Sequence, residues 1–130
     1  MKHLAIALLT LIRKYWRSLS LFCLTIITIL SLLPLPELPP VPGTDKTHHF
    51  VAYALLIFPT ALKKPKNWQI IVLFFIGWSG IIELIQPYVN RYGEWQDLAA
   101  NIIGLICGFF AVQIIKWFFP DSTTTNRLKK

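Results

Sequence analysis

The chain has 130 residues, of which 55% are hydrophobic and 15% charged, and it includes five Trp and nine Phe. Soluble domains carry about 25% charged residues, and a chain of this length cannot bury so many aromatic rings in a core of its own. The composition therefore excludes a two-domain protein and favours an integral membrane protein. The net charge of +7 does not indicate nucleic acid as a partner, because no nucleic-acid-binding motif is present and the basic residues cluster at the ends of apolar segments.

Residues 1–17 begin with an apolar run, Leu4–Ile12, which is cut short by the sequence RKYWR. Nine residues cannot cross a bilayer. We expect this run to form a short interfacial helix beside the first membrane span, or to continue that span. No small-x-small cleavage site follows the first long apolar run, so a cleaved signal peptide is not expected.

Residues 18–119 contain four apolar segments that predict membrane spans. A span needs about 20 apolar residues, and flanking Trp, Tyr, Lys and Arg extend the shorter segments into the interface. The proline-rich segment 34–43 and the basic turn KKPKN at 63–67 separate neighbouring spans. The fold class is thus all-α, a bundle of four transmembrane helices: Ser18–Leu33, His48–Leu62, Trp68–Ile85 and Leu98–Phe119.

The basic residues predict the orientation of this bundle. With the N-terminus inside, all but two of the 13 Lys and Arg residues fall on the cytoplasmic side, and only Lys46 and Arg91 fall outside. All acidic residues except Asp121 fall outside. We therefore expect a multi-pass protein of the bacterial cytoplasmic (inner) membrane with both termini in the cytoplasm. Residues 120–130 read as a charged, disordered cytoplasmic tail.

Polar residues recur at helical spacing near the predicted outer face. Residues at i, i+4 and i+7 share one face of a helix, which aligns Asp45 with His49 and Tyr53, and Glu83 with Gln86. On the last span Asp97 and Asn101 precede a GxxxG pair, Gly104 and Gly108, which lets a neighbouring helix approach closely. These stripes predict a polar pocket open to the outer surface, lined by Asp45, Lys46, His49, Tyr53, Glu83, Gln86, Arg91, Asp97 and Asn101.

This set of residues resembles a known family. The pattern D-K-x-x-H-F-x-x-Y, then E-x-x-Q, then R, then D-x-x-x-N-x-x-G-x-x-x-G is similar to that of the VanZ-like family of small bacterial membrane proteins. The resemblance implies a cell-envelope role, with a link to low-level resistance to the glycopeptide antibiotic teicoplanin. It covers roughly residues 45–108 and rests on Asp45, Lys46, His49, Phe50, Tyr53, Glu83, Gln86, Arg91, Asp97, Asn101, Gly104 and Gly108.

Three hypotheses follow for the pocket. In the first, the pocket binds an anionic or glycan-bearing lipid-linked envelope component, with Lys46 and Arg91 holding negative charge. In the second, the protein is an enzyme on the same substrate class, with Glu83 or Asp97 as general base and His49 as its partner. In the third, the polar residues only lock the helices together through salt bridges.

No metal or other cofactor is predicted. A mixed metal site can be drawn from Asp45, His49, Glu83 and Asp97, but no HxxxH or HExxH spacing accompanies these residues. The expected partners are the lipid bilayer and a lipid-linked envelope precursor. A bundle of this size could also form a homo-oligomer, and the sequence singles out no interface for one.

Overall fold

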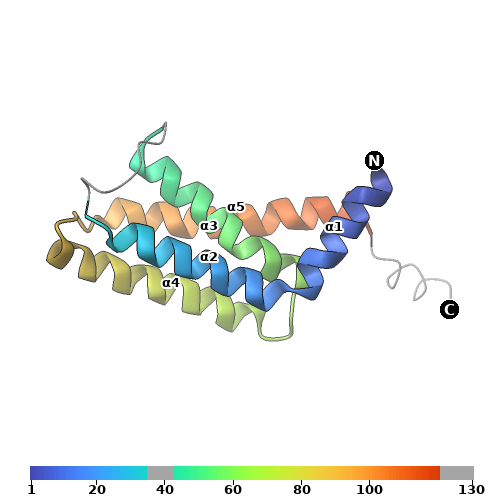
Figure 1. Cartoon of the computed structure of the whole chain (residues 1–130), viewed down its shortest axis with the longest axis horizontal. Coiled ribbons are helices and arrows are strands. Elements are labelled where there is room, and N and C mark those ends of the chain that lie inside the picture. The colour runs from blue at the N-terminus through green and yellow to red at the C-terminus, as the bar shows by residue number, and fades with distance from the viewer. Residues whose placement is uncertain (35–42, 121–130) are drawn as a thin grey trace.

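The computed structural model describes residues 1–34 and 43–120, and this part of the chain is helical apart from connecting turns (Figure 1). The rest of the proline-rich segment and the predicted tail from residue 121 onward lie outside the described residues. The elements in chain order are α1 (Lys2–Lys14), α2 (Trp16–Leu32), α3 (Asp45–Lys63), α4 (Trp68–Ile85), a 3₁₀ turn η2 (Gln86–Val89) and α5 (Trp95–Phe118).

Two or three membrane spans fit this arrangement. The stretches Trp68–Val89 and Trp95–Phe118 are long and apolar enough to cross a bilayer, and α1 with α2 together make a third candidate that is bent by 77°. The bundle is therefore helical and suited to a membrane, but the expected four spans are not confirmed. The expected span without support is the second, His48–Leu62, which corresponds to α3; Asp45, Lys46 and two histidines in its first turns lower its hydropathy.

The bend between α1 and α2 lies at Tyr15, whose φ and ψ leave the helical region of a regular α-helix. Thus α1 is a separate helix at a steep angle to α2, and a straight continuation of the first span is excluded. Its side chains Leu4, Ile6 and Leu8 are exposed. An exposed apolar face on a steeply angled helix fits the expected interfacial location, which stays a prediction.

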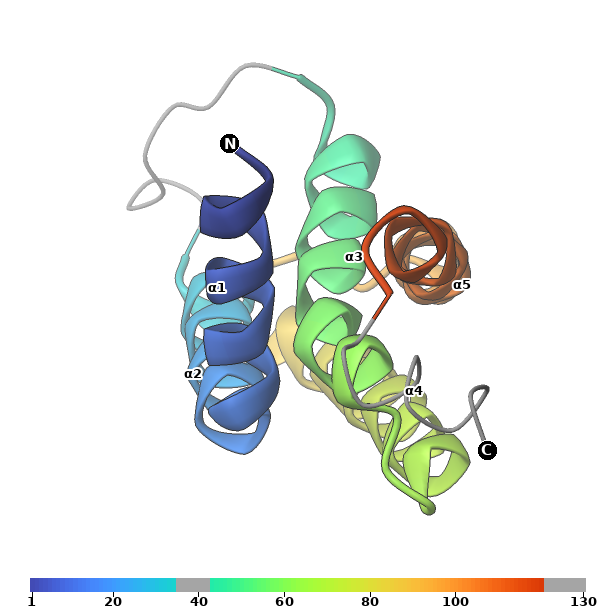
Figure 2. The same cartoon turned by 90° about the vertical axis from the view of Figure 1, so that its right-hand side faces the viewer.

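Helix α3 lies at the centre of the bundle. Figure 2 shows it between the α1–α2 pair and α5, and it contacts every other α-helix. Leu56, Ile57 and Leu62 of α3 are fully or almost fully buried and pack with Leu105 and Val112 of α5. Because α3 is covered on most sides by protein, it can carry polar groups that a lipid-facing helix would expose to hydrocarbon.

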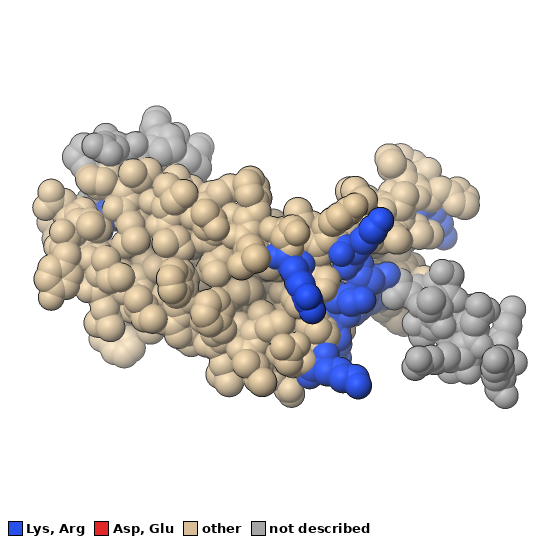
Figure 3. Space-filling view, turned by 60° about the horizontal axis from the view of Figure 1, so that its bottom comes forward, with Lys and Arg blue, Asp and Glu red and all other residues tan. Residues whose placement is uncertain are grey.

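The two ends of the bundle carry opposite kinds of charge. We call the first the basic end, where Lys and Arg side chains gather in the space-filling view (Figure 3). The sequence and helix bounds place there Arg13, Lys14, Arg17, Lys63, Lys64, Lys66 and Lys116. We call the second the acidic end, where α3 and α5 begin and α4 ends; it holds Asp45, Glu83, Glu94 and Asp97 together with Lys46 and Arg91. This separation agrees with the charge asymmetry from which the orientation is predicted.

Candidate functional site at the acidic end

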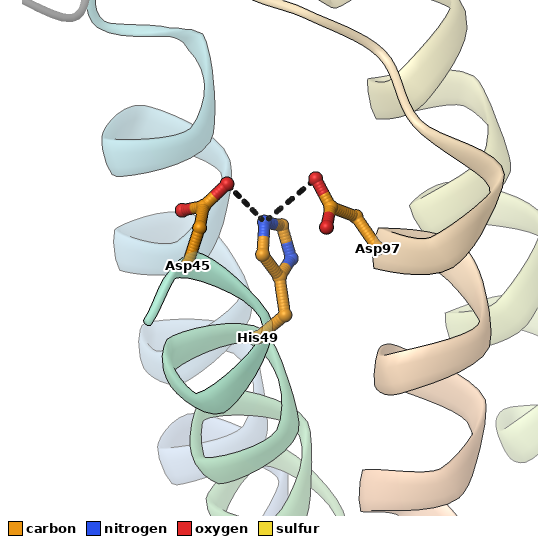
Figure 4. A group of neighbouring side chains, drawn as sticks. All are labelled: Asp45, His49 and Asp97. Atoms are coloured by element: carbon orange, nitrogen blue, oxygen red, sulfur yellow. Dashed lines mark ion pairs between the residues drawn. The ribbon is translucent and has the colours of Figure 1, made fainter. Parts of the chain in front are cut away.

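The start of α3 fixes the first two residues of the site. The Thr44 hydroxyl accepts a hydrogen bond from the Thr47 amide (3.2 Å), which caps the helix so that it begins at Asp45. Asp45 and His49 then stand one turn apart, and Asp45 Oδ2 lies 3.9 Å from His49 Nε2 (Figure 4). The imidazole of His49 is buried, whereas Asp45 is exposed at the end of the bundle.

Helix α5 supplies the other side of the site. Asp97 Oδ2 lies 3.7 Å from His49 Nε2, on the opposite side of the ring from Asp45 (Figure 4). One turn further along, Asn101 Oδ1 lies 2.9 Å from His49 Nδ1, and Asn101 Nδ2 donates to Ser79 Oγ of α4 at 2.6 Å. Three helices thus converge on a buried polar chain, as the helical spacing predicts for α3 and α5.

The hydrogen bonds of Asn101 define the state of the His49 ring. A carbonyl oxygen only accepts, so Nδ1 of His49 carries a proton and donates it to Asn101 Oδ1. In neutral His49 the lone pair is therefore on Nε2, the atom that faces Asp45 and Asp97. Three potential metal-ligand atoms, one each from Asp45, His49 and Asp97, lie within 4.8 Å of one another. This group could hold a metal ion.

Two glycines of α5 set the distance between these helices. A Cβ atom on Gly104 would overlap the carbonyl of Phe50 in α3. A Cβ on Gly108 would lie 2.7 Å from the Ala54 carbonyl oxygen and 2.6 Å from a methyl carbon of Ile57. The backbones of α3 and α5 therefore meet along this glycine stripe, and the close approach brings His49 within reach of Asp97 and Asn101.

Lys46 pairs with acids of the loop before α5 and of α5 itself. Its Nζ lies 3.1 Å from Glu94 Oε2 and 3.7 Å from Asp97 Oδ1. The hydrogen bond to Glu94 raises the pKa of Lys46, and nearby Asp97 and Asp45 act in the same direction. Lys46 is half exposed and lies on the solvent side of the site. Exposed salt bridges are weak, so a ligand could compete with Glu94 for Lys46.

Arg91 and Gln86 contact the end of α2. Arg91 is buried, and its Nη1 donates to the carbonyls of Leu30 and Leu33, each at 3.3 Å. Gln86 Nε2 donates to the Ser31 carbonyl at 3.1 Å. The last carbonyls of α2 lack intrahelical partners, so these two side chains cap α2 and lie apart from the His49 group.

Glu83 lies at the junction of α4 and α5. Its Oε2 accepts a hydrogen bond from the Glu94 amide at the start of α5 (3.1 Å). The positive end of the helix dipole there stabilises the negative charge of Glu83. Its Oε1 is buried and has no hydrogen-bond partner among the described residues. Tyr53 is also buried, one turn beyond His49, and bonds to Ser79. Of the acids in the mixed site drawn from sequence, Glu83 alone is outside the group that could hold a metal.

A groove of about 500 Å³ lies between α4 and α5 at the acidic end. Two glycines create it, since a Cβ on Gly77 or Gly80 would meet nothing within 4 Å. Its walls are otherwise mostly apolar, and it reaches the polar groups of the acidic end. The lining residues are Gly77, Gly80, Ile81, Glu83, Leu84, Gly93, Glu94, Trp95 and Leu98. Sequence reasoning missed this groove, although two glycines three residues apart on one helix face were a visible signal.

Comparison with protein families decides the relationship that the motifs suggest. The family model described as VanZ/LLP1 matches residues 4–116. The chain belongs to the VanZ/LLP1 family. The VanZ/LLP1 match begins in α1 and ends near the close of α5, so it contains the His49 group, the glycine stripe and the groove. Neither the curated proteins nor the solved structures compared with the chain include a match.

Proposed function

We propose that this VanZ/LLP1 protein binds a lipid-linked cell-envelope component at the acidic end, with the lipid chain in the groove between α4 and α5 and a glycan at its polar end. The observation that carries this proposal is the groove itself, which is apolar along α4 and ends at the carboxylates of Glu83 and Glu94. A lipid-linked glycan has the same order of parts, a long apolar chain followed by a polar head.

The size and lining of the groove support such a ligand. Binding pockets typically have volumes of about 300–1,000 Å³ and combine apolar walls with a few placed polar groups. The wall residues Ile81 and Leu84 are exposed on the surface of α4, so a lipid could enter sideways from the bilayer. Trp95, which is 76% exposed at the mouth, offers an aromatic face to a sugar ring.

The charges favour a glycan over a bare phosphate within the groove. Carboxylates accept hydrogen bonds from sugar hydroxyls but repel phosphate, and the two charged residues lining the groove are both acids, Glu83 and Glu94. Arg91 is committed to the carbonyls of α2. Lys46, beside Glu94, is the exposed cation placed to meet the phosphate that joins the glycan to its lipid. In relatives, resistance to teicoplanin would follow from shielding such an envelope target.

An enzyme acting on the same substrate class is the second candidate. The observation that favours it is a buried carboxylate, Asp97, whose Oδ2 lies 3.7 Å from His49 Nε2. Proton transfer between them would require the pair to close to hydrogen-bond distance when substrate binds. In this reading Asp97 or Glu83 acts as general base and His49 as its partner. A binder would leave the lipid unchanged, so chromatography of the lipid after incubation separates the two: conversion by wild type and none by Asp97→Asn would establish the enzyme.

The test of binding compares thermal midpoints of purified protein in nanodiscs with a polyprenyl diphosphate that carries a glycan, and with the same lipid without it. The glycan-bearing lipid is expected to raise the midpoint of wild type but not of Gly80→Leu, which fills the groove, or of Glu83→Gln, which removes charge at its mouth. Gly80→Leu should fold normally because its Cβ meets open space. Ala111→Leu places the same leucine side chain at an exposed position of α5 outside the groove and is the matched control.

Equal shifts in wild type and Gly80→Leu would show that the lipid binds elsewhere, and the absence of any shift in wild type would reject the proposed ligand. A purely structural role for the polar residues makes a different prediction: Glu83→Gln would then melt far below wild type, with no response to lipid in either protein.

A further inference from the structure

The geometry points to a divalent metal site at the acidic end, formed by Asp45 and His49 of α3 and Asp97 of α5 (Figure 4). The spacing of these residues along the chain predicts no such site, because no second histidine stands one turn from His49. The fold supplies the missing ligand from another helix. Asp97 is 48 positions from His49 in the chain and yet faces the same ring nitrogen as Asp45.

The ring of His49 is set up as a ligand. Its Nδ1 proton is held by Asn101 Oδ1 at 2.9 Å, and Asn101 is fixed in turn by its bond to Ser79. Metal-bound histidines usually donate their second ring N–H in this way, which fixes the tautomer and points the free nitrogen at the metal. The lone pair on Nε2 of His49 is thereby directed at two carboxylates, a repulsive arrangement unless a cation lies between them.

Asp97 gives an independent indication that a cation is required. Asp97 is only 2% exposed, and its Oδ1 atom is buried without any hydrogen-bond partner among the described residues. The nearest cation that the structure places there, Lys46 Nζ, is 3.7 Å away and is engaged more closely by Glu94. A buried carboxylate is unfavourable unless paired or bound to a metal. The second oxygen, Oδ2, faces His49 Nε2, and a metal ion bound there would balance the charge of this buried carboxylate.

The distances fit a metal after small movements. Ligand bonds of about 2.0–2.2 Å around a tetrahedral ion separate neighbouring donor atoms by roughly 3.4 Å. The observed separations from His49 Nε2 are 3.7 Å to Asp97 Oδ2 and 3.9 Å to Asp45 Oδ2. The Asp45 side chain is 58% exposed at the first residue of α3, so it is free of tight packing and can close the remaining gap.

The ligand set indicates the class of metal. One imidazole nitrogen and two carboxylate oxygens suit Zn²⁺ or Mn²⁺. Three protein ligands leave at least one position open, and exposed Asp45 places that position on the solvent side of the site, where water or an oxygen of a bound ligand would complete the shell. Among the described residues, the acidic end has four carboxylates and the two basic side chains Lys46 and Arg91, so a dication would balance their charge.

The test measures metal binding by the full-length protein, purified without an affinity tag and stripped of metal with EDTA. Zn²⁺ or Mn²⁺ is titrated into the protein in detergent, and binding is followed by calorimetry. Wild type is expected to bind one equivalent per chain. Asp45→Asn changes an exposed side chain and should fold normally, and it is expected to weaken metal binding by about tenfold or more. Asn101→Ala is expected to weaken binding by a similar factor, because it removes the hydrogen bond that orients the His49 ring. His49→Gln is expected to abolish it. The chain has three histidines, so His3→Gln and His48→Gln are matched controls that should bind as wild type does.

Two outcomes would overturn the proposal: no saturable binding by folded wild type, or equal binding by wild type, Asp45→Asn and His49→Gln. The first would mean that no metal ion lies between the two carboxylates, and the second that the metal binds elsewhere. Since the titration contains no lipid, neither outcome bears on the groove, and the proposed function stands or falls on its own experiment.

Discussion

Replacing Gly104 by alanine should destabilise the bundle, whereas the same replacement at Gly77 should not. Both glycines lie inside helices, so the intrinsic effect is the same: alanine favours the helix by up to about 1 kcal/mol. The surroundings differ. The new methyl group at Gly104 would overlap the Phe50 carbonyl of α3, whereas at Gly77 it would meet nothing within 4 Å.

The size of the effect follows from what can move. A flexible side chain could rotate away from the new methyl group, but Phe50 presents backbone to Gly104, so α3 as a whole must shift. Overpacking of this kind costs roughly 1–3 kcal/mol or more, which exceeds the helix gain of about 1 kcal/mol. We expect Gly104→Ala to lower the free energy of unfolding by about 1–2 kcal/mol. Gly77→Ala should leave it unchanged or raise it by up to about 1 kcal/mol.

Unfolding by SDS titration in mixed micelles, followed by far-UV circular dichroism, measures both variants under one condition. The shift of α3 should also separate His49 from Asp97 and Asn101, so Gly104→Ala should lose metal affinity while Gly77→Ala keeps it. Equal stability of Gly104→Ala and wild type, or an equal loss in both variants, would refute the close backbone contact between α3 and α5.

Two further predictions concern the cap of α2 and the orientation. Arg91→Met should lower the free energy of unfolding by about 1–3 kcal/mol, because the Leu30 and Leu33 carbonyls lose a charged donor; exposed Arg17→Met should change it by less than about 0.5 kcal/mol in the same SDS titration. In a cysteine-free background, a membrane-impermeant thiol reagent should label Tyr92→Cys on intact cells but Lys66→Cys only after permeabilisation. Labelling of the second alone would reverse the predicted orientation.

The sequence predicts which polar residues share a helix face, because that follows from helical periodicity. Asp45 and His49 are one turn apart, as are Asp97 and Asn101, and each pair must lie on one face once its helix forms. The GxxxG pair then indicates which face of the last helix packs closely. These are local relations, and the structure brings Asp45, His49, Asp97 and Asn101 together as the pattern predicts.

Features that depend on contacts between distant segments were not predictable in the same way. Arg91 could be read as a phosphate ligand because nothing local indicates that its guanidinium reaches the carbonyls of Leu30 and Leu33, about 60 residues earlier in the chain. The groove likewise depends on how α4 and α5 diverge. The proposed metal site needs both kinds of information: the local pair Asp45 and His49, and a third ligand, Asp97, whose side chain is placed only by the packing of α5 on α3.

The central position of α3 explains how a helix with several buried polar residues can carry the candidate site. A helix that faces lipid must be apolar around its surface. Because α3 contacts α1, α2, α4 and α5, its polar side chains can face protein instead of lipid. Its buried polar residues, His49, Tyr53 and Thr60, each bond or lie close to a partner on a neighbouring helix. The feature that prevents α3 from reading as a membrane span by hydropathy is therefore the feature that lets it hold ionisable groups inside the bundle. In this protein, weak hydropathy in a central helix indicates where the buried polar group lies.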